Sequence, residues 1–237
     1  DPIGSRGLGD VYKRQISAVR STMLQEGFLE VETPMMHSIP GGAVAKPFIT
    51  HHNALDRELF LRIDPELHLK RLLVGGFEKV FEINRSFRNE GLSTRHNPEF
   101  TMLEFYAAFA TFKGTIDFTT RIILSASEAI GNSTQIEWDG DKIDLTSFQT
   151  KTLAELVLAE NAELSNEDLK SIETLRAFSS SMNISYKDSW GAGKILLEIF
   201  EKTVESKLIQ PTFVTDYPVE VSPCLLYTSD AADEVVS

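Results

Sequence analysis

Apolar residues recur at helical spacing in four stretches of the chain. In residues 16–26, Ile16, Val19 and Met23 fall on one side, and Gly27 follows where a helix would end. The same spacing predicts helices over 65–76, 115–130 and 191–208. Residues 65–76 carry Pro65 at the start and glycines at the end, which is the usual order for a helix.

Other stretches are rich in β-branched and aromatic residues and predict strands. They are residues 28–33, 48–55, 58–63, 79–90, 98–109, 134–146 and 211–221, the sixth read as a hairpin that turns at Asp139-Gly140. Two capping boxes are expected, at Thr152 with Glu155 and at Ser165 with Asp168. Strands joined by hairpin-length loops favour an α+β fold with a largely antiparallel sheet, and the sequence shows no clear domain boundary.

The strand over 98–109 carries a carboxylate in an apolar row. Alternate side chains share a face, so Glu104 lies in line with Phe100, Met102 and Tyr106. Because both faces are mostly apolar, we expect this strand to be central in the sheet and buried on both sides. A buried charge without a partner is costly, so Glu104 needs a cation. That cation is either an internal arginine or lysine, or a bound ligand.

The segment just before that strand carries groups suited to a phosphate. Arg88 and Glu90 lie two apart on an extended stretch and share a side, and the loop that follows carries Arg95 and His96. A guanidinium can fork onto a phosphate or a carboxylate, although a surface ion pair between Arg88 and Glu90 remains the plainer alternative. The sequence contains neither a Walker A motif nor the glycine pattern of a dinucleotide-binding turn.

Composition narrows the class of protein without identifying it. The 237 residues are 42% hydrophobic with a formal net charge of −12, which argues against a surface built mainly to hold polyanions. No stretch approaches the roughly 20 consecutive apolar residues that span a bilayer, and no export signal opens the chain. The single cysteine is Cys224, so disulfides and thiolate zinc sites are not expected.

Both ends have an unusual composition. Residues 5–15 (SRGLGDVYKRQ) and 224–234 (CLLYTSDAADE) resemble translations of the two arms of a sequencing adapter. We therefore expect residues 1–15 and 224–237 to be of artificial origin and residues 16–223 to be the natural segment, cut short at both ends. A natural glycine-rich lead and acidic tail is the alternative.

The motifs together resemble class II lysyl-tRNA synthetases. GFLEVETPMM (27–36) resembles motif 1 of that class, and FRNEG with RHNPEFTMLEFY (87–106) resembles motif 2. Residues 39–90 and 210–223 carry features of the lysyl branch. The resemblance implies a class II catalytic domain, an antiparallel sheet flanked by helices. It also implies activation of L-lysine with ATP and transfer to tRNA(Lys), in a cytoplasmic homodimer without membrane association.

The resemblance also implies a role for particular residues. The ATP-binding residues would be Arg88, Glu90, His96, Asn97 and Phe100, and the lysine-binding residues Gly42, Glu66, Arg88, Glu104 and Tyr106. Arg88 would be catalytic, bridging the α-phosphate of ATP and the lysine carboxylate. Phe100 would stack on adenine. Glu104 and Tyr106 would hold the ε-ammonium, Glu66 the α-ammonium, and Gly42 would offer a backbone contact.

The departures from the family pattern limit what this chain alone should do. The anticodon-reading domain, motif 3 and the acidic ligands of Mg²⁺ are absent from the sequence, so no metal site is expected here. We expect this polypeptide to form lysyl-adenylate at no useful rate. Two alternatives stay open. One is a synthetase-like paralog that lysylates a translation factor, and the other is a non-catalytic regulatory module with the same fold.

Overall fold

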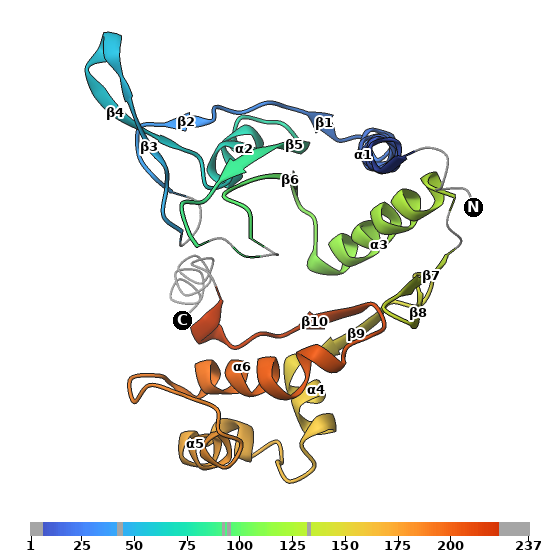
Figure 1. Ribbon diagram of the computed structural model, residues 1–237, viewed down its shortest axis with the longest axis vertical. Coiled ribbons are helices and arrows are strands. Elements are labelled where there is room, and N and C mark those ends of the chain that lie inside the picture. The colour runs from blue at the N-terminus through green and yellow to red at the C-terminus, as the bar shows by residue number, and fades with distance from the viewer. Residues whose placement is uncertain (1–6, 42–44, 92, 94–95, 132–133, 223–237) are drawn as a thin grey trace. The chain divides into compact units, whose positions relative to one another are not determined.

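The computed structural model describes residues 7–41, 45–91, 93, 96–131 and 134–222. Within these ranges the chain forms two compact units that divide after Gly131, a boundary that the sequence did not indicate. Figure 1 shows the path of the chain, and each unit is described by itself. The mixture of helices with mainly antiparallel strands confirms the predicted α+β class.

Two helices of the first unit pack against each other. Helix α1 spans Gly7–Gln25 and helix α3 spans Phe112–Ala129, and they lie side by side (Figure 1). The first helix begins nine residues before the predicted start at Ile16. Lys13, Arg14 and Gln15 are good helix formers, and Asp10 and Arg14 form an ion pair one turn apart, 3.1 Å between Oδ2 and Nε. Their helical backbone does not test the predicted artificial origin of this end.

The central sheet of this unit has the order β1-β5-β6. Strand β5 (Lys79–Phe87) pairs in parallel with the short β1 (Leu29–Glu30) and antiparallel with β6 (Glu99–Ala107) over its whole length. The prediction that 98–109 is the central strand is wrong for the described residues. The central strand is β5, and β6 is an edge with half-buried side chains, because one of its faces packs on the core and the other borders the candidate site.

A second small sheet has the order β2-β4-β3. Strands β2 (Met36–His37), β3 (Ile49–His52) and β4 (Arg57–Leu61) pair antiparallel, and the β3–β4 connection turns at Asp56 in a left-handed conformation, φ 45°. Helix α2 (Glu66–Val74) follows β4, with Pro65 just before its first turn, close to the predicted position. This helix packs against both β5 and β6.

Aromatic rings build the core of the first unit. Phe28, after α1, stacks on Phe118 of α3 with ring centroids 5.1 Å apart. Phe105 of β6 meets both rings edge-on, at 5.7 and 5.3 Å. Phe81 and Met23 are fully buried beside them. The core therefore fixes β5 and β6 against α1 and α3, which leaves the opposite face of β6 to the candidate site.

The second unit is mainly helical. Its helices are α4 (Leu153–Glu160), α5 (Ile172–Ser181) and α6 (Ala192–Thr203), which share one apolar core. Strands β7 (Gln135–Trp138) and β8 (Asp141–Asp144) form the predicted hairpin, with positive φ at both turn residues, and β9 (Gln149–Thr152) pairs in parallel with β10 (Thr212–Thr215). Both predicted capping boxes are present as reciprocal hydrogen bonds.

No helix in the described part of the chain has the length and apolar character needed to cross a bilayer.

Candidate functional site

The β5–β6 hairpin positions most of the candidate residues. Nine consecutive cross-strand pairs run from Lys79 opposite Ala107 to Phe87 opposite Glu99. The pairing continues where the Arg88 amide donates to the Pro98 carbonyl at 2.9 Å. Near the tip, Ser93 and His96 form an isolated antiparallel bridge, and the Ser93 hydroxyl lies 2.7 Å from the His96 Nδ1. This ladder fixes which side chains of the hairpin share a face.

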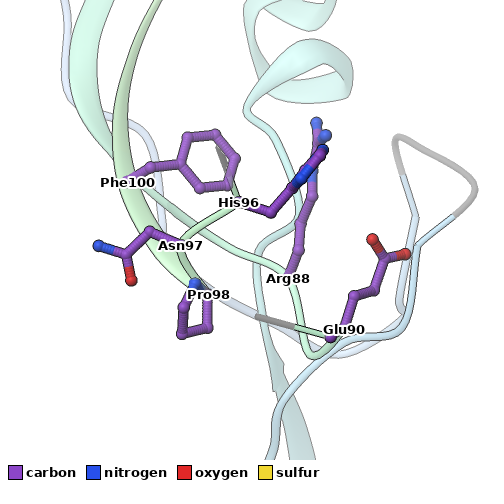
Figure 2. A pocket seen from close by; sticks show the side chains of 7 residues that line it. Arg88, Glu90, His96, Asn97, Pro98 and Phe100 are labelled. Carbon is purple, nitrogen blue, oxygen red and sulfur yellow. The ribbon is translucent and has the colours of Figure 1, made fainter. Parts of the chain in front are cut away.

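A cavity of about 290 Å³ lies at the tip end of this hairpin. Its lining is Arg88, Glu90, Gly91, His96, Asn97, Pro98 and Phe100. Figure 2 shows the Arg88 side chain and the Phe100 ring extending to the same side of the hairpin. The guanidinium carbon of Arg88 lies 5.2 Å from the centre of the Phe100 ring, within cation–π distance.

The lining of this cavity suits an anion bound beside a flat ring. The Nε of Arg88 is buried and has no hydrogen-bond partner among the described residues. No ion pair joins Arg88 to Glu90 in the described part of the chain, so the plainer surface-pair alternative finds no support. A buried guanidinium donor without a partner is costly until an acceptor reaches it, and a phosphate or carboxylate oxygen is the acceptor it fits best.

Further along β6, Glu104 lies beside Tyr106 on the same face. The Tyr106 hydroxyl donates to Glu104 Oε2 at 3.3 Å. Burial raises the pKa of Glu104 to about 7, the charge of Asp64 adds to this, and the Tyr106 hydrogen bond opposes it. Burial and the Glu104 charge also raise the pKa of the Tyr106 hydroxyl. Glu104 is therefore a carboxylate that a cation would stabilise.

Two more carboxylates approach this face from the start of α2. Asp64 is 6% exposed, and its Oδ1 accepts the Glu66 backbone N–H at 3.1 Å, which satisfies a donor in the first turn of the helix. Burial raises the pKa of Asp64 more than this hydrogen bond lowers it. Glu66 pairs with Lys70 one turn later. Lys70 Nζ in turn lies 5.8 Å from the centre of the Tyr106 ring.

A fully buried ion pair lies next to these groups. Arg62 Nη1 is 2.8 Å from Glu82 Oε1, and the two side chains are 0% and 1% exposed. Arg62 also donates from Nε to the Arg85 carbonyl at 2.8 Å and from Nη1 to the Thr33 hydroxyl at 2.9 Å. Glu82 accepts from the Thr33 hydroxyl and from the Asn84 amide as well. These contacts connect the residue after β4, strand β5 and the segment after β1.

The structure brings the predicted residues together in two groups. The five predicted for ATP line the cavity at the hairpin tip: Arg88, Glu90, His96, Asn97 and Phe100. Glu104 and Tyr106 meet on β6, and Lys70 connects Tyr106 to Glu66. Gly42 and Arg95 lie outside the described residues.

Sequence reasoning missed Asp64 and Lys70. Lys70 stands four residues after Glu66 on a predicted helix, and that spacing alone marks the two as facing each other. Asp64 carries no such signal, because an acidic residue before a helix is favourable whatever else it contacts.

Carboxylate oxygens are also the ligands that Mg²⁺ prefers. No group of three or more His, Cys, Asp or Glu side chains in the described ranges is arranged to hold an ion.

Comparison with known proteins gives concordant results. Residues 10–236 match the family described as tRNA synthetases class II (D, K and N). The lysine–tRNA ligase of Xanthomonas axonopodis pv. citri is 56% identical over 209 residues, 88% of this chain and 41% of the relative. That of Thiobacillus denitrificans is 55% identical over 221 residues, 93% and 44% of the two chains. This chain thus spans less than half the length of the curated relatives that it matches. With the family match covering nearly all of its residues, the chain belongs to the class II tRNA synthetases of the D, K and N group.

Proposed function

We propose that this chain is part of a lysyl-tRNA synthetase, which activates L-lysine with ATP and transfers the lysyl group to tRNA(Lys). The observation that carries the proposal is the placement of two complementary groups along one strand. An arginine and an aromatic ring border a cavity near Phe100, and a carboxylate without an ion-pair partner among the described residues follows at Glu104. The names of the relatives, all lysine–tRNA ligases, support the same reaction.

ATP occupies the hairpin-tip cavity in this proposal. The adenine ring stacks on Phe100, and Arg88 offers its unpaired Nε to an oxygen of the α-phosphate. His96, Asn97 and Glu90 contribute polar groups around the nucleotide. The Arg88 guanidinium is a positive group held in place before the ligand arrives, so it stabilises charge without rearranging during the reaction.

Lysine lies toward Glu104. Its ε-ammonium pairs with Glu104 and contacts the Tyr106 hydroxyl, its α-ammonium pairs with Glu66, and its carboxylate meets Arg88. An ammonium group beside Glu104 favours the ionised carboxylate and lowers its raised pKa. The cation that Glu104 lacks among the described residues is then supplied by the substrate.

The chemistry that follows is a displacement at phosphorus. A lysine carboxylate oxygen attacks the α-phosphorus, the bond to the pyrophosphate oxygen breaks, and lysyl-adenylate and pyrophosphate result. Arg88 contacts both the carboxylate and the phosphoryl oxygens, so it aligns them and offsets the developing negative charge. A terminal hydroxyl of the tRNA then attacks the lysyl carbonyl carbon, and AMP leaves.

The wider context follows from the same reaction. ATP is a substrate, and Mg²⁺ accompanies it in the whole protein through groups that the described residues do not supply. The protein works on tRNA in the cytoplasm as a homodimer, with the motif 1 segment (27–36) at the subunit contact.

Ligand binding to this chain tests the proposal. Isothermal titration calorimetry with L-lysine and, separately, with ATP should show weak saturable binding of both. Glu104→Gln should weaken lysine binding at least about tenfold, the loss of roughly one charge-assisted hydrogen bond, and leave ATP binding within about twofold. Phe100→Leu should do the reverse.

Glu99→Gln is the matched control, since it removes a carboxylate from the same strand. Glu99 is exposed and pairs at 3.6 Å with Arg85 on the surface. This variant should bind both ligands like the parent chain. If Glu104→Gln binds lysine as tightly as Glu99→Gln does, the assignment of Glu104 to the substrate is wrong.

A further inference from the structure

Lys70 lies between two residues that the proposed function gives to the substrate. Its ammonium pairs with Glu66 on its own helix, and it lies 5.8 Å from the centre of the Tyr106 ring on β6. The Tyr106 hydroxyl donates to Glu104. A single internal cation therefore connects the carboxylate proposed for the α-ammonium with the tyrosine proposed for the ε-ammonium.

The contact with Tyr106 distinguishes Lys70 from a simple helix-surface lysine. An ion pair four residues apart stabilises a helix by only a few tenths of a kcal/mol, and solvent competes with it. The side chains of Lys70 and Glu66 are 39% and 36% exposed, so the pair can open without disturbing the core. Because Tyr106 belongs to a different element, the lysine reaches across from α2 to β6 rather than out into solvent.

The charges on this face explain why a resident cation is useful. Asp64, Glu66 and Glu104 approach one another closely enough for the charges of Asp64 and Glu66 both to raise the pKa of Glu104. Without a ligand, three carboxylates in partial burial repel one another. Lys70 neutralises one of them in the ligand-free protein and leaves an excess of negative charge for an incoming ligand with two ammonium groups.

We propose that Lys70 is a competing residue that occupies Glu66 in the ligand-free protein and is displaced by the α-ammonium of the amino acid. This inference rests on the proposed function, since it needs an ammonium-binding site at Glu66. The displacement of Lys70 is expected only for ligands that carry an α-ammonium. Lysine must displace Lys70 because it carries an α-ammonium, whereas 6-aminohexanoate has the same carboxylate and ε-ammonium but no α-ammonium, so it binds without displacing Lys70.

Two ligands and three variants test the proposal by calorimetry on the full chain. Lys70→Gln should tighten L-lysine binding about threefold, because the competing ion pair and cation–π contact are lost. Binding of 6-aminohexanoate should not change. Lys70→Arg keeps the charge and should bind both ligands as the parent chain does. Circular dichroism verifies the helix content of each variant.

Lys194→Gln is the matched control. Lys194 also pairs with a glutamate one turn away, Glu198, at 2.7 Å, and lies 5.2 Å from the Trp190 ring, but it belongs to the second unit. This variant should leave both affinities unchanged.

The possible outcomes separate the two proposals. If the parent binds lysine and Lys70→Gln binds it equally or more weakly, the role of Lys70 is overturned while the proposed function stands. If Lys70→Gln binds lysine and the parent chain does not, competition between Lys70 and the ligand for Glu66 is supported in its strongest form. If neither binds lysine, Glu66 is not an ammonium site in this chain, and both the site assignment and the inference are overturned.

Discussion

Glu82 and Glu104 stand directly opposite each other on β5 and β6, and their surroundings differ completely. Glu82 is 1% exposed and receives the Arg62 guanidinium, the Thr33 hydroxyl and the Asn84 amide. Glu104 receives one hydrogen bond, from Tyr106, and no ion pair from the described residues. Glu82 on β5 thus has its partners supplied by the protein, whereas Glu104 on β6 lacks a cationic partner among the described residues.

In the proposed function, this difference separates a structural carboxylate from a binding one. The partners of Glu82 come from the same chain, and breaking them leaves a buried charge. The partner that Glu104 lacks among the described residues would come from the ligand, and without it the carboxylate has a raised pKa. Glu104 also lies on the face shared with Phe100, whose cavity is the proposed nucleotide site. Three experiments address this contrast.

The largest effect is expected from Arg62→Met. Removing the guanidinium leaves Glu82 charged and buried, which should lower the free energy of unfolding of the first unit by about 3–5 kcal/mol. Hydrogen exchange measured by mass spectrometry over residues 79–87 reports on this unit. Protection there should fall by about two orders of magnitude or more.

The control for that substitution lies on β5 itself. Arg85→Met removes an arginine whose surface pair with Glu99 spans 3.6 Å, with both side chains about half exposed, so its effect should stay below about 1 kcal/mol. Equal loss of protection in the two variants would show that the Arg62–Glu82 pair is no more structural than a surface pair.

An intermediate effect is expected from the pH dependence of Glu104. Its pKa is about 7 in the folded protein against 4.5 for an ordinary glutamate, so between these values the folded state binds more protons than the unfolded state. The contribution of Glu104 to stability is therefore highest below pH 4.5 and falls as the pH rises toward 7. In the ligand-free parent chain, Glu104 should lower the free energy of unfolding by up to about 2 kcal/mol between pH 5 and pH 8. In Glu104→Gln this decrease should be absent.

Urea unfolding at pH 5 and pH 8, followed by far-ultraviolet circular dichroism, measures this difference. Saturating lysine should reduce the loss in the parent chain and have no such effect in the variant. Parallel pH profiles for parent and variant without ligand would contradict the raised pKa.

The smallest effect is expected from Asp64→Asn. An asparagine oxygen can still accept the Glu66 N–H, so this hydrogen bond is kept while the charge is removed. Because Asp64 is the charge that raises the Glu104 pKa most, the midpoint of Glu104 should move down by a fraction of a unit to about one unit. Carbon-13 NMR of the side-chain carboxyl carbons measures it, and an unmoved midpoint would show that the charge of Asp64 does not contribute to this pKa.

Much of the local structure could be predicted from the sequence. The turn at Asp139-Gly140, the capping boxes and the helix after Pro65 depend on residues close in the chain, and the structure has each of them. The carboxylate at Glu104 was also apparent, because alternation places it in an apolar row whatever the tertiary fold.

What the sequence left open depends on contacts between distant segments. Glu82 stands in an alternating pattern on its strand just as Glu104 does. No local feature of the sequence shows that Arg62, from another segment, pairs with Glu82 and not with Glu104. The apolar pattern of β6 was read as burial on both sides. It arises instead from a core-facing row, including Phe105, and a row that borders the candidate site, including Phe100 and Met102.

The continuous pairing of β6 with β5 also fixes the distance between two residues of the candidate site. Phe100 and Glu104 share a face four residues apart, which places their positions on the strand about 13 Å from each other. In the proposed function this one strand contacts both the adenine ring and the lysine side chain, and a ligand too short to reach both residues gains only half of the contacts. A substitution at either end changes one contact. An inserted or deleted residue between them would change the separation by about 3.3 Å and also turn Glu104 to the opposite face, so this interval should tolerate changes of residue type but not of length.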